Sequence, residues 1–188
     1  MSSREHILAK IKAIPKEASP LPEIPSFESP LGHKAAFILS IQANKGEVIT
    51  ESELKDFIAI NRFEKILNLT KGMESLSTQP LPSDAHELNE LEVAIIQGQF
   101  GVAENGAIWL TDENMGLRVL PFITEHLVIV LNEKSLVSNM HEAYNKIGIQ
   151  HSGFGLFIAG PSKTADIEQS LVIGAHGAKS LRVVLTNL

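Results

Sequence analysis

Cysteine is absent from the 188-residue chain, and its absence excludes several kinds of chemistry. The chain can form no disulfide, offers no thiol nucleophile and cannot hold an iron–sulfur cluster on cysteine ligands. A zinc site would need histidines and carboxylates alone, which is uncommon. Any redox chemistry therefore requires a bound organic cofactor, a metal held by such side chains, or a partner protein. The sequence identifies no particular cofactor.

Positive charge is also scarce. Only 16 residues are Lys or Arg, against 22 Asp or Glu, and the formal net charge is −6. Clustered basic residues with interleaved aromatic residues are missing, so we expect no nucleic-acid-binding surface. A small anionic ligand needs only a few N–H donors and one or two cations, and this class of ligand stays open.

Long apolar runs are missing as well. None approaches the roughly 20 residues that a membrane-spanning helix needs. The first residues, Met1–His6, lack the basic-then-apolar layout of a signal peptide. We therefore expect no membrane span and a cytoplasmic location.

The length predicts one domain with a sizeable core. Residues 3–14 have the apolar spacing of an amphipathic helix, which we expect to pack on the domain or on a neighbour. Residues 15–33 contain five of the nine prolines, which predicts a semi-rigid arm on the surface or one reaching another subunit of a homo-oligomer. A partly disordered segment is the alternative. We assign residues 1–33 to this N-terminal helix and arm, and residues 34–188 to a single α/β domain.

Short, almost wholly apolar segments alternate with helical patterns in that domain. Helices are predicted after the capping residues Thr50 and Ser138, and at about residues 164–171. The helix after Ser138 is expected to bury Met140, Tyr144 and Ile147 on its inner face. Buried strands alternating with helices predict an α/β fold, a three-layer αβα arrangement around a mostly parallel sheet. The predicted strands are Ala35–Ile41, Lys65–Leu69, Val93–Ile96, Ala107–Leu110, His126–Leu131, Leu156–Ala159 and Leu181–Leu185.

One predicted strand-to-helix junction has the features of a ligand site. In open α/β sheets, ligands bind beyond the carboxyl ends of the strands. Free N–H groups at the start of the following helix would attract an anion, and a lysine would add positive charge. The same pattern also fits an ordinary, well-capped connection. The ligand-binding candidates here are Gly160, Pro161, Ser162, Lys163, Thr164 and Asp166.

Two further positions are catalytic candidates. Glu104 precedes the turn-forming pair Asn105–Gly106, where a carboxylate can act as base or nucleophile. His126 opens a buried strand and can carry a proton. His176 and Gly177, in a glycine-rich loop before the last strand, join the ligand-binding candidates. No histidine pair has metal-ligand spacing, so no metal site is predicted.

The residues of this second half resemble a known family. Gly160–Glu168 resembles the GPSrTaDIE signature of the LUD domain family, the LutC/YkgG-like lactate-utilisation proteins. Three shorter landmarks agree with it: Ala103–Gly106, Leu120–Pro121 ahead of His126, and Gly174–Gly177. These matches cover about residues 93–188. Lys163 stands where arginine is usual, and Glu104–Ala107 replaces a more typical Glu/Asp-Thr-Gly-Thr.

The resemblance implies a fold similar to the NagB/RpiA/CoA-transferase superfamily. It also implies a non-cluster subunit that works beside iron–sulfur partner proteins in oxidising L-lactate to pyruvate. Such a subunit would bind a small carboxylate or phosphate-bearing ligand.

Two alternatives stay open. Ala103–Gly106 also resembles the Ser-Glu-Asn-Gly motif of family I CoA-transferases, whose glutamate forms the acyl–CoA link. The chain would then be an acyl-transfer enzyme with Glu104 as nucleophile. In the second alternative, it is a scaffold subunit without chemistry of its own. The sequence does not decide whether the chain is an enzyme.

Overall fold

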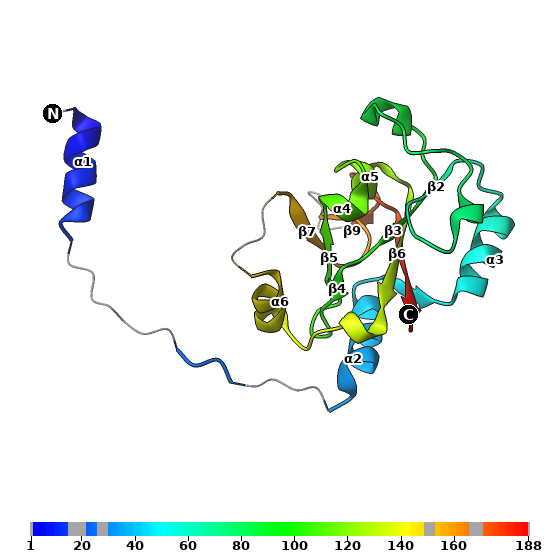
Figure 1. The fold of residues 1–188 in the computed structure, drawn as a ribbon, viewed down its shortest axis with the longest axis horizontal. Helices are drawn as coiled ribbons and strands as arrows, with labels where there is room; N and C mark the ends of the chain where they lie inside the picture. The colour runs from blue at the N-terminus through cyan, green and yellow to red at the C-terminus, as the bar shows by residue number, and fades with distance from the viewer. Residues whose placement is uncertain (1, 15–21, 26–29, 149–152, 166–170, 188) are drawn as a thin grey trace.

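The computed structural model describes residues 2–14, 22–25, 30–148, 153–165 and 171–187. Its centre is a five-stranded sheet in which every neighbouring pair of strands is parallel (Figure 1). The α/β fold with a mostly parallel sheet is therefore confirmed. In spatial order the strands are β1 (Glu47–Ile49), β10 (Ser180–Thr186), β6 (His126–Asn132), β3 (Val93–Gln97) and β2 (Ile66–Asn68).

A smaller antiparallel sheet packs beside the central one. It contains β4 (Phe100–Gly101), β5 (Ile108–Thr111) and β7 (Gly155–Ile158). The Asn105–Gly106 pair lies in the turn between β4 and β5, as the sequence predicts. Short helical segments join the strands: α4 (Asp112–Met115), α5 (Leu120–Ile123), η1 (Glu74–Leu76), η2 (Ala85–Leu88) and η3 (Glu133–Ser135).

The core lies on both faces of the central sheet. On one face, Leu54 of α3 (Glu51–Asn61) packs with Val128 and Val130 of β6. On the other face, Leu127 and Ile129 of β6 pack with α2 (Gly32–Ala43) and the small sheet. Because neighbouring side chains of a strand point to opposite faces, β6 must be apolar along its buried stretch, Leu127–Leu131. This explains the run of five apolar residues that predicts it.

The predicted strand at Ala35–Ile41 is wrong, because these residues belong to helix α2. A short apolar run is compatible with either a buried strand or a buried helix, and periodicity alone does not separate them. The two completely buried residues of α2 are Phe37 and Ile41, four residues apart on one helix face. Leu39, between them in sequence, is 53% exposed.

The other helix predictions have mixed outcomes. Thr50 and Glu53 form the expected capping box at the start of α3. The N-cap of α6 (Met140–Ile147) is Asn139 rather than Ser138, and its side chain accepts from the Glu142 N–H. The buried residue of α6 is Ala143, whereas Tyr144 is 63% exposed. Tyr144 was therefore wrongly assigned to the inner face.

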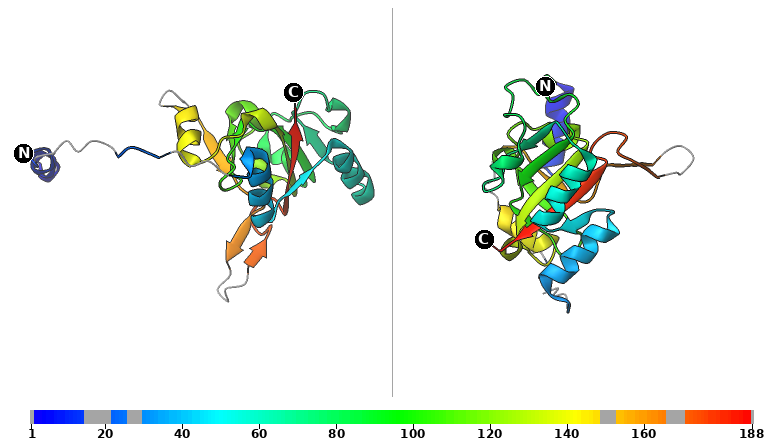
Figure 2. Two further views of the ribbon diagram at one scale, coloured as in Figure 1. Left: turned by 90° about the horizontal axis from the view of Figure 1, so that it is seen from below. Right: turned by 90° about the vertical axis from the view of Figure 1, so that its right-hand side faces the viewer.

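The predicted helix at residues 164–171 is wrong at both ends, and its middle, residues 166–170, lies outside the described residues. The described residues there form an antiparallel hairpin of β8 (Lys163–Ala165) and β9 (Leu171–Ile173). Figure 2 shows this hairpin projecting from the body of the domain. The candidate Asp166 lies outside the described residues.

The N-terminal helix is α1 (Ser3–Lys12), and it has the predicted Ser2–Glu5 capping box. None of its residues is buried, and Figure 1 shows it apart from the domain. The expected packing of this helix on the domain is therefore not observed. Most of the proline-rich arm lies outside the described residues. In the described part of the chain, no helix has the length and apolar character needed to cross a membrane.

Candidate functional site

The two glycine-containing loops of the second half come together around a small hollow. It contains five of the predicted ligand-binding residues, and its volume is about 190 Å³. The Ser162 N–H donates to the Ala178 carbonyl at 2.9 Å, and the Gly174 N–H donates to the Ser162 carbonyl at 3.0 Å. These bonds join the loop after β7 to the loop before β10. The lining residues are Pro121, Phe122, Leu127, Ile158, Gly160, Pro161, Ser162, His176, Gly177 and Ala178.

Apolar groups form most of the hollow. Its side-chain hydrogen-bonding groups are the half-buried Ser162 hydroxyl and the exposed imidazole of His176. Gly160 has a positive φ of 83°, and a Cβ there would press on the backbone of Asn44. A glycine is therefore needed where this loop passes α2. The hollow is smaller than the roughly 300–1,000 Å³ typical of drug-sized ligands, so it suits a small one.

The signature segment extends beyond the hollow into the hairpin. Lys163 is exposed and starts β8, and Thr164 follows it in the same strand. In the described residues, Ser162 is followed by strand β8 and not by a helix, so the expected helix-terminal N–H groups do not lie next to Ser162. Donors in this region would instead come from Ser162, His176 and the loop backbone.

Glu104 serves a different part of the structure. Its exposed carboxylate accepts a hydrogen bond of 3.0 Å from the N–H of Met140, the first residue of α6. Its own N–H donates to the Ser138 carbonyl at 3.0 Å. A carboxylate at a helix N-terminus is stabilised by the unpaired N–H groups and by the helix dipole. A nucleophilic role of Glu104 stays a prediction, and its observed contacts are those of a helix cap.

His126 is built into the packing beneath α3. Its ring contacts Phe57 and Phe63, with centroid distances of 5.4 and 5.1 Å. Its Nδ1 lies 2.8 Å from the oxygen of the Ser180 hydroxyl, and this oxygen accepts a hydrogen bond of 2.6 Å from Arg182. Burial lowers the pKa of His126, and the charge of Arg182 lowers it further. The neutral imidazole is therefore favoured.

The predicted site residues thus do not form one group. Leu127 lines the hollow, and its neighbour His126 points to the opposite face of the sheet, toward α3. Both lie at the amino end of β6, whereas the sequence analysis expected a site at carboxyl ends. Gly160 does follow the carboxyl end of a strand, but that strand is β7 of the small antiparallel sheet.

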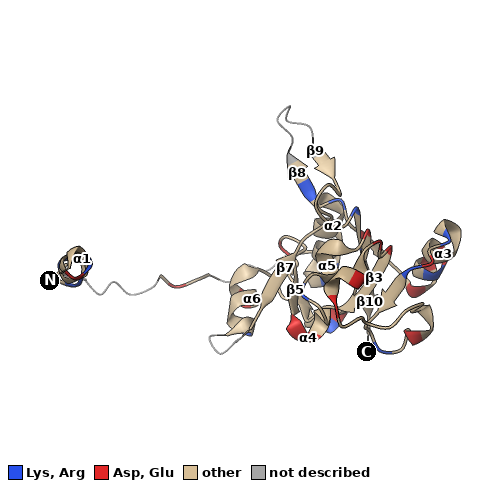
Figure 3. Cartoon of the chain, turned by 90° about the horizontal axis from the view of Figure 1, so that it is seen from above, with Lys and Arg blue, Asp and Glu red and all other residues tan. Residues whose placement is uncertain are grey.

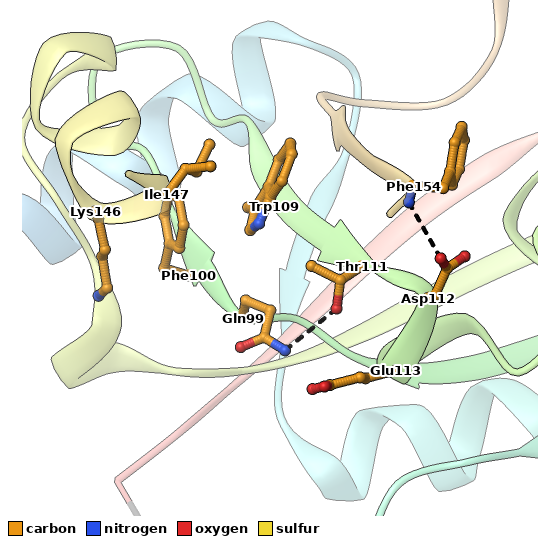
Figure 4. A pocket seen from close by; sticks show the side chains of 9 residues that line it. All are labelled: Gln99, Phe100, Trp109, Thr111, Asp112, Glu113, Lys146, Ile147 and Phe154. Atoms are coloured by element: carbon orange, nitrogen blue, oxygen red, sulfur yellow. Dashed lines mark hydrogen bonds between the residues drawn. The ribbon is translucent and has the colours of Figure 1, made fainter. Parts of the chain in front are cut away.

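A second, larger cavity was missed by the sequence analysis (Figure 4). Its volume is about 420 Å³, and Gln99 on its wall lies just beyond the carboxyl end of β3. The carboxyl-end rule, applied to that strand, would have pointed to it. The lining residues are Gln99, Phe100, Trp109, Thr111, Asp112, Glu113, Lys146, Ile147 and Phe154.

In the described part of the chain, no three or more His, Asp or Glu side chains converge as metal ligands would.

Comparison with known proteins assigns the chain to a family. The LUD domain profile matches residues 3–186, which is nearly the whole sequence. The chain belongs to the LUD domain family. The match includes the N-terminal helix and arm as well as the segment that carries the signature.

Several curated relatives of this LUD-domain chain are named Lactate utilization protein C. The one from Shouchella clausii is 34% identical over 121 residues, covering 56% of this chain and 52% of that protein. The one from Deinococcus radiodurans is 30% identical over 120 residues, covering 62% and 56%. The aligned part of this chain thus spans about half the length of these relatives.

A solved structure supports the fold of the LUD-domain chain. It is a crystal structure of a DUF162 family protein from Deinococcus radiodurans, with a TM-score of 0.60. The likeness covers 81% of this chain and 94% of that one at 17% sequence identity, and it is evidence for the fold alone.

Proposed function

We propose that this chain is a component of a lactate-utilisation system. The observation that carries the proposal is the LUD domain match over residues 3–186, together with relatives named Lactate utilization protein C. The chain contains no cysteine, so an iron–sulfur cluster on cysteine ligands would have to belong to a partner. In this proposal the chain is the non-cluster subunit and works beside iron–sulfur partner proteins that oxidise L-lactate to pyruvate.

The proposed ligand site is the hollow around Ser162 and His176. Its volume of about 190 Å³ suits a small carboxylate such as lactate or pyruvate. The Ser162 hydroxyl and a protonated ring nitrogen of His176 can donate hydrogen bonds to a carboxylate. Lys163 follows Ser162 directly and adds positive charge near the rim. The apolar walls would contact the ligand's methyl group.

The growth of a strain that lacks the gene tests the proposed role in lactate utilisation. We expect the deletion strain to lose growth on L-lactate, to keep growth on pyruvate, and to recover when the wild-type gene is restored. Growth on L-lactate equal to that of the parent would contradict the proposed role, whatever the hollow binds.

Ligand binding is tested separately with the purified chain. We expect L-lactate, pyruvate or inorganic phosphate to raise the melting temperature of the wild type but not of His176→Ala. The matched control is His86→Ala, since His86 is also exposed but lies in η2, outside the hollow. If none of the three anions shifts the wild type, the ligand part of the proposal is wrong.

A further inference from the structure

The cavity beside β5 has a surface suited to an aromatic ring. Phe100, Trp109 and Phe154 line it, and Trp109 is only half-buried. Phe157 supports Trp109 at a centroid distance of 4.7 Å, and Phe100 lies 6.5 Å away in a stacked arrangement. A rigid aromatic side chain that borders a cavity can stack on a planar ligand of almost any identity.

One side of this cavity carries a positive charge. Lys146 reaches from the last turn of α6, and its Nζ lies 5.1 Å from the centre of the Phe100 ring. It donates one hydrogen bond, of 3.2 Å, to the Ser135 carbonyl. An ammonium group has three hydrogens, so Lys146 can also donate to an anionic group of a ligand.

The other side is acidic, and much of its charge is compensated. Asp112 accepts from Arg118 at 2.7 and 3.0 Å and from the Phe154 N–H at 3.1 Å. Glu113 is exposed next to it. Figure 4 shows Lys146 and Glu113 at opposite sides, with Trp109, Gln99 and Thr111 between them. A ligand spanning the cavity would meet a cation, an aromatic surface with polar neighbours, and a carboxylate acceptor.

We propose that this cavity binds a mononucleotide, a phosphate-bearing planar heteroaromatic ring whose ring contacts Trp109 and whose phosphate contacts Lys146. Ribose hydroxyls or an exocyclic amine then donate to Glu113. The volume of about 420 Å³ lies within the range of small-molecule sites. The position beyond the carboxyl end of β3 is one where parallel sheets commonly bind such ligands. The cavity is separate from the hollow at Ser162, because among the described residues none lines both.

The chain itself provides a reporter for this binding. Trp109 is its single tryptophan, so the intrinsic tryptophan fluorescence comes from the wall of the cavity. We expect AMP to bind saturably and to change the tryptophan fluorescence excited at 295 nm. We expect flavin mononucleotide also to bind saturably, as measured by calorimetry. Adenosine and riboflavin, which lack the phosphate, should bind at least about tenfold more weakly, since a charge-assisted hydrogen bond is lost.

A lysine variant tests the geometry. Lys146→Ala should weaken binding of the phosphorylated ligand at least about tenfold, and should leave binding of the matching nucleoside or riboflavin nearly unchanged. The matched control is Lys134→Ala, because Lys134 is also exposed and donates to a backbone carbonyl, that of Asn187, but lies outside the cavity.

Two results would overturn the proposal. One is the absence of saturable binding of both phosphorylated ligands up to millimolar concentration. The other is an equal effect of Lys146→Ala and Lys134→Ala on the affinity for the ligand that binds. Neither result depends on whether the hollow at Ser162 binds a carboxylate or on growth on lactate.

Discussion

The turn that holds Glu104 packs directly on the backbone of α2, and one glycine makes this possible. Gly106 has a φ of +70°, and a Cβ there would lie 3.0 Å from the Ile41 nitrogen and 3.0 Å from the Ser40 carbonyl carbon. The Ser40 hydroxyl donates to the Ala103 carbonyl at 2.8 Å across the same interface. Backbone atoms of a helix cannot turn aside as the end of a side chain can, so Gly106→Ala must strain or separate the two elements.

The cost of Gly106→Ala has two parts. An alanine in the left-handed region costs about 1 kcal/mol. Forcing an extra methyl group against packed atoms costs about 2 kcal/mol more. The free energy of unfolding should therefore fall by about 3 kcal/mol. For a chain of this size, that corresponds to a fall in melting temperature of about 6–12 °C.

Gly72→Ala is the matched control for this prediction. Gly72 also has a positive φ, +86°, but a Cβ there would meet no atom within 4 Å. Only the conformational part of the cost applies, so we expect a fall of about 2–4 °C. Circular dichroism melts and urea titrations of both variants measure the difference. Equal losses of stability would refute the argument that close contact with α2 requires glycine at position 106.

Three further predictions concern the N-terminal helix and the two catalytic candidates. Deletion of residues 2–14 should leave the melting temperature unchanged, because none of the described residues of α1 is buried; a clear fall would show that the helix packs on the domain in solution. Glu104→Ala should lower the free energy of unfolding by about 1 kcal/mol in urea titrations, since the Met140 N–H loses its acceptor, and a change near zero would contradict the capping role. Burial lowers the pKa of His126, so the unfolded chain binds a proton near pH 6 that the folded chain does not. The contribution of neutral His126 to the free energy of unfolding is therefore complete above the pKa of the unfolded chain, and it is lost as the pH falls through the pKa of the folded chain. His126→Phe should reduce the loss of stability between pH 7 and pH 5. An unchanged dependence of the free energy of unfolding on pH would contradict this.

The fold was predictable wherever local chemistry and tertiary packing agree. The strand at His126–Leu131 is buried on both faces, and its apolar run is decisive. The capping box at Thr50 and Glu53 marks the start of α3 correctly, because it satisfies backbone donors within the segment itself. The strand prediction for Ala35–Ile41 is wrong because the burial of α2 depends on partners far away in sequence, such as the residues around Gly106.

The candidate site could be predicted only in part, for a similar reason. Gly160–Ser162 and His176–Gly177 lie around one hollow, as their shared assignment requires, and binding there stays a prediction. His126 lies on the other face, which follows from the alternation of side chains along β6 once Leu127 is known to border the hollow. The large cavity combines one or two residues each from β4, β5, α4, α6 and the loops, and no short motif marks such a set.

The family signature links the hollow to the projecting hairpin, and this link has a mechanical consequence. In the described residues, β8 and β9 pair with each other alone, and Figure 3 shows them standing out from the rest of the domain. Val172 and Ile173 of β9 are 40% and 43% exposed. A two-stranded hairpin is marginally stable without further packing, so its position depends on its base. That base is held by the two backbone hydrogen bonds of Ser162, with Ala178 and Gly174, and Ser162 and Ala178 also line the hollow. Because Ser162 belongs to both, we expect a ligand bound in the hollow to restrict the hairpin, and a partner bound to the hairpin to change the affinity of the hollow.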